Sequence, residues 1–428
     1  MKTTSFILSK ETFFMSSIIS QYPPSVRRFL VGAFLNALGG GLTMPIMVVY
    51  LNQVRGLSLT SASLVLSWMA ISGLISSPVF GWLVDRFGPR IVLLSSILIE
   101  SLATALWSTV HDVKSAYFIG TLSAIGNAGI WPPQATMMAR MVEEEHRQKL
   151  FGLQFMMLNL GLGIGGLVSS TIVRVENPQT FTKLFVLDAF SYLVYFFFIL
   201  SLRGIGGRLP ESIHEKEEGS YREMLRDKRL VRLSLISILL MTAGYASMDA
   251  GMPAMLTTSG GLEVSQLGPI WAVNTGVIVI LQITMLNKLQ GRSRTKLFAV
   301  VGMLWSISWL VLGVGLLNPG WVFLAACIAT AIFAVGETVW SPVGSSLQNA
   351  IAPEHMRGRY NAVGGLVWVI AGTIGPAFSG FMLERGWAIQ WLLVIAAAAL
   401  LAGYLGQSLR RLITDKEDGI LESAEQSV

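Results

Sequence analysis

Residues 61–90 read SASLVLSWMAISGLISSPVFGWLVDRFGPR, and this stretch decides the fold class. Segment 61–84 is predominantly apolar, and a short charged loop separates it from a second apolar segment at 90–110. About 20 predominantly apolar residues in a helix are enough to cross the core of a bilayer. Because backbone groups in lipid must hydrogen-bond within the protein, the stretch predicts two membrane helices joined by a tight turn.

Similar apolar segments fill the rest of the chain. Of its residues, 53% are hydrophobic and 13% are charged, whereas about 25% of a typical soluble domain is charged. The composition therefore predicts an all-α membrane protein. Its twelve transmembrane helices are expected at about 29–51, 61–84, 90–110, 115–140, 148–173, 181–203, 231–257, 263–286, 295–317, 320–349, 357–383 and 387–409.

One long polar connection divides these helices into two sets of six. Residues 204–230 contain a charge run at 214–218, whereas the other connections are short. This division predicts five regions, which are a tail at 1–28, a six-helix bundle at 29–203, a linker at 204–230, a second six-helix bundle at 231–409 and a tail at 410–428.

The basic residues indicate the orientation of the chain. If both tails are cytoplasmic, the outer side holds five basic residues and the cytoplasmic side holds the other 26 of the 31 lysines and arginines. Cytoplasmic loops of membrane proteins carry such an excess of basic residues. Both termini are therefore expected in the cytoplasm. The outer residues are Arg55, Lys114, Arg174, Lys183 and Arg385.

The two halves share a pattern that indicates an internal repeat. Residues 131–133 read Trp-Pro-Pro and residues 340–342 read Trp-Ser-Pro, with 209 positions between their tryptophans (131 to 340). The same spacing relates Gly163 to Gly372, Gly166 to Gly375, and the pairs Glu145-His146 and Glu354-His355. Transporters built from repeats bind substrate near the midplane, between the halves.

The charged loop after residue 80 has a definite spacing of glycine, acid and arginine. A carboxylate at Asp85 can interact with the positive end of the following helix and with nearby arginines. The glycines permit a tight turn and close packing. The spaced residues are Gly81, Asp85, Arg86, Gly88 and Arg90.

This loop resembles the signature between helices two and three of the major facilitator superfamily. Two further stretches are similar to the same family, at 352–360, which includes Arg357, and at 187–192. The resemblance implies two pseudo-symmetric six-helix bundles and a conformational role for the loop residues. Within the superfamily, the stretch 372–376 resembles the Gly-x-x-Gly-Pro pattern of twelve-helix bacterial drug:proton antiporters, through Gly375 and Pro376.

One departure from that antiporter pattern bears on coupling. Proton-coupled exporters of this kind usually carry an arginine in helix four, and this chain has no basic residue between Lys114 and Arg140. The same region contains Asn127, which we include among the candidate substrate or coupling residues. This departure argues against the usual coupling mechanism, and the group that carries the transferred proton has to be identified separately.

Carboxyl groups at membrane depth are candidates for that role. A charge in the hydrocarbon region is costly and is by default a functional hypothesis. A desolvated carboxyl group tends to hold a proton and releases it when hydrated, which is the basis of coupling. Glu337, near the middle of the tenth helix, is the first candidate, and Asp249 in the seventh is the second. Asp188 and Glu100 are more often structural, in packing or cross-helix bonding.

Three other residues complete the candidate site. Asn36 lies in a glycine-rich first helix, where bending at a gate is expected. Trp131 and Trp340 are candidates for an adaptable apolar binding wall, although such side chains more often only pack.

Together these features predict a secondary active transporter that works by alternating access. The resemblance implies proton-coupled efflux of lipophilic small molecules across a bacterial plasma (inner) membrane. Transport of a lipid, glycolipid or specific metabolite is the alternative within the family, and a non-transporting receptor or assembly partner is the alternative outside it. No enzyme, nucleotide or cofactor motif is seen in the sequence. A metal motif is not seen either, because Cys327 has no partner residue for binding a metal. We expect no nucleic-acid partner and a monomer in the lipid bilayer.

Overall fold

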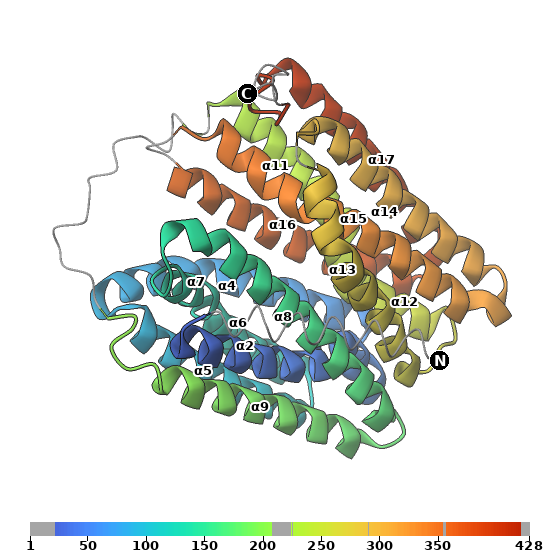
Figure 1. Ribbon diagram of the computed structural model, residues 1–428. Coiled ribbons are helices and arrows are strands. Elements are labelled where there is room, and N and C mark those ends of the chain that lie inside the picture. Colours follow the sequence, from blue (N-terminus) through green and yellow to red (C-terminus); the bar gives the residue numbers. More distant parts are fainter. Residues whose placement is uncertain (1–21, 208–223, 225, 290, 354–356, 421–428) are drawn as a thin grey trace, which may run out of the picture.

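The computed structural model describes residues 22–207, 224, 226–289, 291–353 and 357–420. These residues form an all-helical protein, as predicted. Within the described residues, eleven helices are long and apolar enough to cross a membrane. Figure 1 shows α2 to α9 gathered in one bundle and α11 to α17 in the other.

The first bundle contains the following elements: α2 (Pro24–Thr43), η1 (Met44–Ile46), α3 (Met47–Val49), η2 (Tyr50–Val54), α4 (Leu59–Phe87), α5 (Pro89–Leu106), η3 (Trp107–Thr109), α6 (Val113–Ala128), α7 (Trp131–Ala139), α8 (Glu144–Ile172) and α9 (Pro178–Leu200). The second bundle contains α11 (Lys228–Met241), η5 (Thr242–Gly251), α12 (Met252–Thr258), η6 (Val264–Gln266), α13 (Leu267–Leu289), α14 (Arg294–Leu316), η7 (Pro319–Trp321), α15 (Val322–Ile351), α16 (Arg357–Glu384), α17 (Ala388–Ser408) and η9 (Leu409–Arg411).

The fourth predicted span is broken into two helices. The helix α6 ends at Ala128, and α7 begins at Trp131, immediately before Pro132 and Pro133. Proline has no backbone N–H to donate, so two in succession favour a helix start. The corresponding Trp340-Ser341-Pro342 has a single proline there and stays inside the continuous helix α15.

The seventh span is also irregular, and this irregularity shapes the site. Between α11 and α12 the chain forms a π-helix, η5, in which Gly244 has φ −93° and ψ −105°. A Cβ atom at Gly244 would lie 2.2 Å from the Trp305 ring, so only glycine permits this close approach. The kink places Tyr245 and Asp249 on the same irregular segment.

The bundles meet at the ends of the helices that the charge pattern predicts to be on the outer side. The Thr60 backbone at the start of α4 donates a 3.0 Å hydrogen bond to Glu384 at the end of α16. The equivalent contact joins α8 to α13, where a Cβ atom on Gly268 would lie 2.2 Å from the backbone oxygen of Gly166. Both contacts join the two halves of the protein, so the predicted outer side is closed.

The internal repeat is visible in this interface. Gly163 on α8 faces Thr275 on α13, and Gly372 on α16 faces Ala70 on α4. The two glycines, which share the 209-residue spacing, therefore lie at equivalent contacts between the halves (163 to 372). The matching Glu354 and His355 lie outside the described residues.

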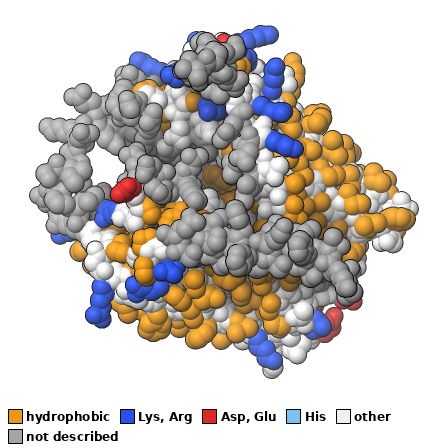
Figure 2. Space-filling model, viewed as in Figure 1, with side chains coloured by type: hydrophobic (Ala, Val, Ile, Leu, Met, Phe, Trp, Pro, Cys, Tyr) orange, Lys and Arg blue, Asp and Glu red, His pale blue; other side chains and the backbone are white. Residues whose placement is uncertain are grey.

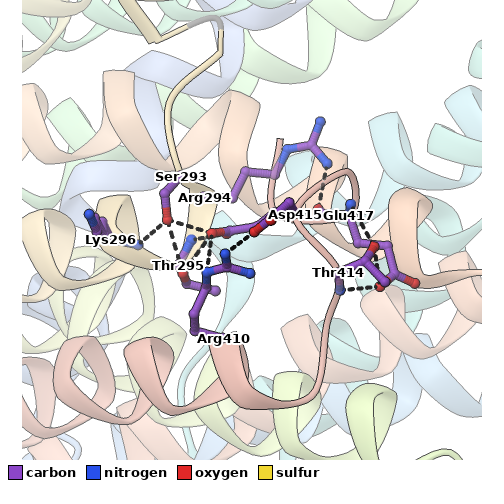
Figure 3. A network of polar contacts seen from close by, with 9 residues as sticks. Ser293, Arg294, Thr295, Lys296, Arg410, Thr414, Asp415 and Glu417 are labelled. Carbon is purple, nitrogen blue, oxygen red and sulfur yellow. Dashed lines mark hydrogen bonds and ion pairs between the residues drawn. The ribbon is translucent and has the colours of Figure 1, made fainter. Parts of the chain in front are cut away.

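The segment after α17 folds back and caps the start of α14 (Figure 3). The buried Asp418 carboxylate accepts hydrogen bonds from the Thr295 backbone N–H at 2.8 Å and from the Ser293 hydroxyl at 2.6 Å. Arg410 also lies beside it, with Nε 3.4 Å from Oδ2. An acidic group at this position satisfies the free N–H groups of a helix start.

Replacement of Asp418 with alanine should therefore destabilise the second bundle. We expect a loss of about 2–3 kcal/mol, because two buried donors would lose their acceptor. Thermal unfolding of the purified protein would measure this loss. The matched control is Asp415→Ala, which removes a mostly exposed partner of Arg410 and should change stability by less than about 0.5 kcal/mol. Equal effects of the two variants would contradict the buried cap.

A second polar contact joins α11 to α16 on the same face of the protein. Asp227 accepts a 2.8 Å hydrogen bond from the Tyr360 hydroxyl and pairs with Arg229 at 2.9 Å. Burial tends to raise the pKa of Asp227, but the hydrogen bonds from Arg229 and Tyr360 outweigh it and leave that pKa below its ordinary value. Asp227 is therefore charged in the folded protein at neutral pH.

Candidate substrate and coupling site

A cavity of about 430 Å³ lies between the two bundles. It extends from the predicted cytoplasmic ends of α11, α15 and α16 toward the middle of α15, where Glu337 lies. The lining comes from α8 of the first bundle and from α11, η5, α15 and α16 of the second. The residues that line it are Phe155, Leu158, Asn159, Leu230, Leu233, Ser234, Ser237, Met241, Tyr245, Glu337, Trp340, Ser341, Gly344, Gln348, Asn361, Gly364, Gly365, Val367 and Trp368.

Glu337 lies against side chains from two other segments. The Asn274 amide on α13 donates a 2.5 Å hydrogen bond to its carboxylate Oε2. The Tyr245 side chain on η5 lies beside the same carboxyl group. The carboxyl group is thus fixed in orientation while it remains part of the cavity wall. A charge-assisted contact of this kind depends on the protonation state of the acid.

Asp249 lies close enough to Glu337 and Tyr245 for its charge to act on both. It is half-buried on η5, and within the described residues no side chain or backbone group donates a hydrogen bond to it. The structure therefore brings both predicted coupling acids to the same region of the second bundle. Protonation of one would change the electrostatic environment of the other.

Aromatic rings form the rest of the deep wall. The Tyr245 ring lies 4.9 Å from that of Trp368 and 5.5 Å from that of Trp305, measured between centroids. Trp305 in turn stacks on Phe333 at 4.6 Å. Trp340, which also lines the cavity, packs edge-on against Phe298 at 5.2 Å. These packed rings present a rigid apolar surface to a ligand.

Among the described residues, the cavity wall has an acidic side chain and no basic side chain to balance it. Among the described lining residues, Glu337 is the one acidic side chain, and none is lysine, arginine or histidine. An anionic ligand would therefore meet a negative or neutral wall with no cation to pair with it. The wall suits a neutral or cationic ligand with an apolar body.

The other predicted substrate residues lie outside the cavity lining. Asn127 and Trp131 are exposed near the break between α6 and α7, and Trp131 is 49% exposed. Asn36 is on α2 in the first bundle, where its Oδ1 atom is buried and has no hydrogen-bond partner within the described residues. In this conformation the structure does not bring these three residues to Glu337.

Glu100 and Asp188 are buried inside the first bundle. The Ser123 hydroxyl on α6 donates a 2.7 Å hydrogen bond to Glu100 on α5. The Thr43 hydroxyl at the end of α2 donates a 2.6 Å hydrogen bond to Asp188 on α9. Each acid thus joins two helices of the same bundle, the arrangement expected of a packing role, and neither belongs to the cavity lining.

The loop motif forms the turn between α4 and α5. Gly88 has φ 84°, a value that favours glycine, and separates the two helices. Arg90 donates hydrogen bonds to the carbonyl oxygens of Ile199 and Leu200 at the end of α9, at 3.3 and 2.6 Å. Arg86 is exposed, with its guanidinium 5.2 Å from the centre of the Trp82 ring.

The remaining glycines of the sequence motifs differ in how closely other atoms pack around them. A Cβ atom on Gly81 would meet nothing within 4 Å, whereas one on Gly375 would lie 2.4 Å from the Cβ of Ala246 on η5. Pro376 is buried inside α16, next to this contact. The side chains of Asp85 and Arg357 lie outside what the structure describes.

Sequence reasoning did not single out Asn274 and Tyr245 as partners of Glu337. The largely apolar α13 carries three amides, which are Asn274, Gln282 and Asn287, so an amide at membrane depth is a signal that draws attention to Asn274 without singling it out. Tyr245 follows Gly244 in span seven, but its direction depends on the kink of η5. The direction of the Tyr245 side chain cannot be read from a helical repeat, because η5 departs from regular α-helical geometry.

The comparisons with known proteins agree with this architecture. A family model described as Major Facilitator Superfamily matches residues 29–341. The chain is 24% identical over 389 residues to the uncharacterized MFS-type transporter YhjO of Bacillus subtilis (strain 168), which covers 90% of this chain and 93% of that protein. Identity to Multidrug resistance protein 2 of the same organism is 23% over 388 residues, covering 87% and 92% of the two chains.

Two further matches extend this comparison. The Na(+), Li(+), K(+)/H(+) antiporter of Planococcus maritimus is 22% identical over 424 residues, covering 90% of this chain and 96% of that protein. A crystal structure of a POT family transporter in complex with a thioalcohol conjugated peptide superposes with a TM-score of 0.76 at 16% identity. It covers 92% of this chain and 99% of that one, and at this identity it supports the fold alone.

Proposed function

Because the chain belongs to the Major Facilitator Superfamily, we propose that this secondary transporter exports lipophilic small molecules, cationic ones in particular, in exchange for protons. The observation that carries the proposal is the position of Glu337, an acid held by Asn274 and next to Tyr245 on the wall of an aromatic cavity. A bound cation and a proton would compete for this one carboxyl group. Such competition is the simplest basis for an obligatory exchange.

The proposed orientation places both termini in the cytoplasm, in a bacterial plasma (inner) membrane. The cavity then opens toward the cytoplasm, while the contacts of α4 with α16 and of α8 with α13 close the outer side. This is the conformation that would receive a substrate for export. Movement of one bundle against the other would then release the substrate outside, where Glu337 takes up the incoming proton.

The proton-coupling step in this proposal needs no arginine in the fourth helix. Because none of the described residues in the cavity wall is a lysine or arginine, the Glu337 charge is balanced by the substrate or neutralised by the proton. Asp249 lies close enough to Glu337 that a negative charge on one of the two acids would disfavour ionisation of the other. The names of two relatives, Multidrug resistance protein 2 and the Na(+), Li(+), K(+)/H(+) antiporter, are compatible with this class of exchange.

The test is uptake by everted membrane vesicles, in which export appears as accumulation. The vesicles would be energised to an acidic interior and offered lipophilic dyes of matched size that are cationic, neutral or anionic. We expect accumulation of the cationic and neutral dyes that collapses when a protonophore is added. The anionic dye should not accumulate. Vesicles from cells without the protein are the control.

Two outcomes would redirect the proposal. If no dye accumulates but phospholipid or metabolite analogues do, the protein is a transporter of those compounds. If ligands bind to the purified protein and none crosses the membrane, it acts as a receptor or assembly partner. Accumulation of the anionic dye in preference to the cationic one would contradict the electrostatic argument.

A further inference from the structure

A second concave surface lies on the side of α11 that faces away from the cavity. It is a groove of about 730 Å³ between α11, the end of α17 and the segment after it. Leu230, Leu233 and Ser237 on α11 line the substrate cavity, whereas Val231 and Leu235 on the same helix line the groove. The spacing of these residues assigns the two surfaces to different faces of one helix.

The groove is basic at one end and apolar along its length. Arg226, Lys228 and Arg232 are exposed at the start of α11, on the predicted cytoplasmic side. Leu235 and Leu239 follow on the same face, about 10 and 16 Å deeper at 1.5 Å per residue. This length matches half of a hydrocarbon core that is about 30 Å thick. Figure 2 shows basic side chains along the upper edge of the protein, next to a broad apolar surface.

The three basic residues of the groove differ from two neighbouring arginines, which pair with acidic side chains. Arg229 is paired with Asp227 and Glu417 at 2.9 and 2.8 Å, and Arg410 contacts Asp418 at 3.4 Å. Within the described part of the chain, no acidic side chain pairs with the three groove residues, which are Arg226, Lys228 and Arg232. Three positive charges thus lie above an apolar channel with no acidic partner among the described residues.

We propose that this groove binds one anionic phospholipid of the cytoplasmic leaflet. The phosphate would lie among the three basic side chains, and an acyl chain would lie along Leu235, Leu405 and Leu412. Basic residues at the membrane surface attract anionic headgroups, and the apolar part fits a chain rather than a soluble anion. The bound lipid supports the outer face of α11, whose opposite face lines the substrate cavity.

The test is lipid binding to the full-length protein, purified and delipidated in detergent. Native mass spectrometry would count bound phosphatidylglycerol, and phosphatidylcholine and glycerol 3-phosphate would serve as the zwitterionic and soluble competitors. The native chain should retain phosphatidylglycerol in preference to both. Comparable binding of phosphatidylcholine, or displacement by glycerol 3-phosphate at similar concentrations, would overturn the proposal.

Two sets of substitutions locate the site. The groove variant combines Arg226→Gln, Lys228→Gln and Arg232→Gln, and it should bind phosphatidylglycerol roughly a hundredfold more weakly, since each basic residue near the surface contributes about a factor of five. The control variant combines three exposed residues elsewhere on the predicted cytoplasmic face, as Arg203→Gln, Lys288→Gln and Arg292→Gln. Equal losses in the two variants would show non-specific attraction and overturn the site.

A third variant tests the apolar part while the charges stay in place. Leu235→Trp adds a ring to a side chain that is 63% exposed in the groove and should block the acyl chain. Reduced phosphatidylglycerol binding is expected, and unchanged binding would show that the groove does not hold the chain. All readouts are binding measurements, so their failure would leave the proposed transport function untouched.

Discussion

In everted vesicles that contain Glu337→Gln, proton-driven accumulation of a lipophilic cation should fall by at least about a hundredfold, as expected when a group that handles the transferred proton is removed. Glutamine has nearly the same shape and can still accept the hydrogen bond from Asn274. It cannot take up or release a proton. Substrate exchange without a proton gradient, measured as counterflow, should therefore survive in this variant.

The matched control is Glu100→Gln, which changes another buried acid in a membrane helix. Glu100 is bonded to Ser123 inside the first bundle and does not line the cavity, so proton-driven accumulation should persist. Expression and thermal stability of both variants would be measured in parallel. Loss of transport in Glu100→Gln with normal accumulation in Glu337→Gln would reverse our assignment of the two acids.

Replacement of Gly268 with valine should trap the transporter with its outer side open. A Cβ atom at this position would lie 2.2 Å from the backbone oxygen of Gly166 across the two bundles. Backbone atoms cannot move aside as a flexible side chain can, so closure of the outer side would be blocked. Net transport should fall at least about tenfold, because closure would cost more than 1.4 kcal/mol.

The conformational effect can be measured directly with spin labels. Cys327 would first be replaced by alanine, and cysteines would then be introduced at the exposed residues Glu176 and Glu263, beyond the outer ends of α8 and α13. The distance between the labels should lengthen in Gly268→Val. The control is Gly276→Val on the same helix, where a Cβ atom would meet nothing within 4 Å. A similar distance in both variants would contradict the packing argument.

The helices were predictable because each apolar segment must form its own backbone hydrogen bonds in lipid. The exceptions occur where local geometry competes with that rule. The break between α6 and α7 follows from two adjacent prolines, and the single Pro342 in the repeated motif leaves α15 continuous. A pattern of hydropathy does not distinguish these cases, whereas the number of missing N–H donors does.

The candidate site was predictable in part. Glu337 is conspicuous because an acid is rare in the middle of an apolar helix, but its partner Asn274 lies 63 positions away on another helix. The rotation of α13 and the kink at Gly244 decide which side chains reach the carboxyl group. Which side of the protein is open follows from a balance between two packed states, so no local pattern encodes it.

The most direct measurement of the central claim is proton release on substrate binding. The purified protein in detergent, without buffer and near neutral pH, would be mixed with a lipophilic cation while a pH indicator is monitored. We predict that substrate binding releases protons from the native chain and that this release disappears in Glu337→Gln although the cation still binds. Binding without proton release in the native chain, or undiminished release in Glu337→Gln, would contradict exchange at this carboxyl group.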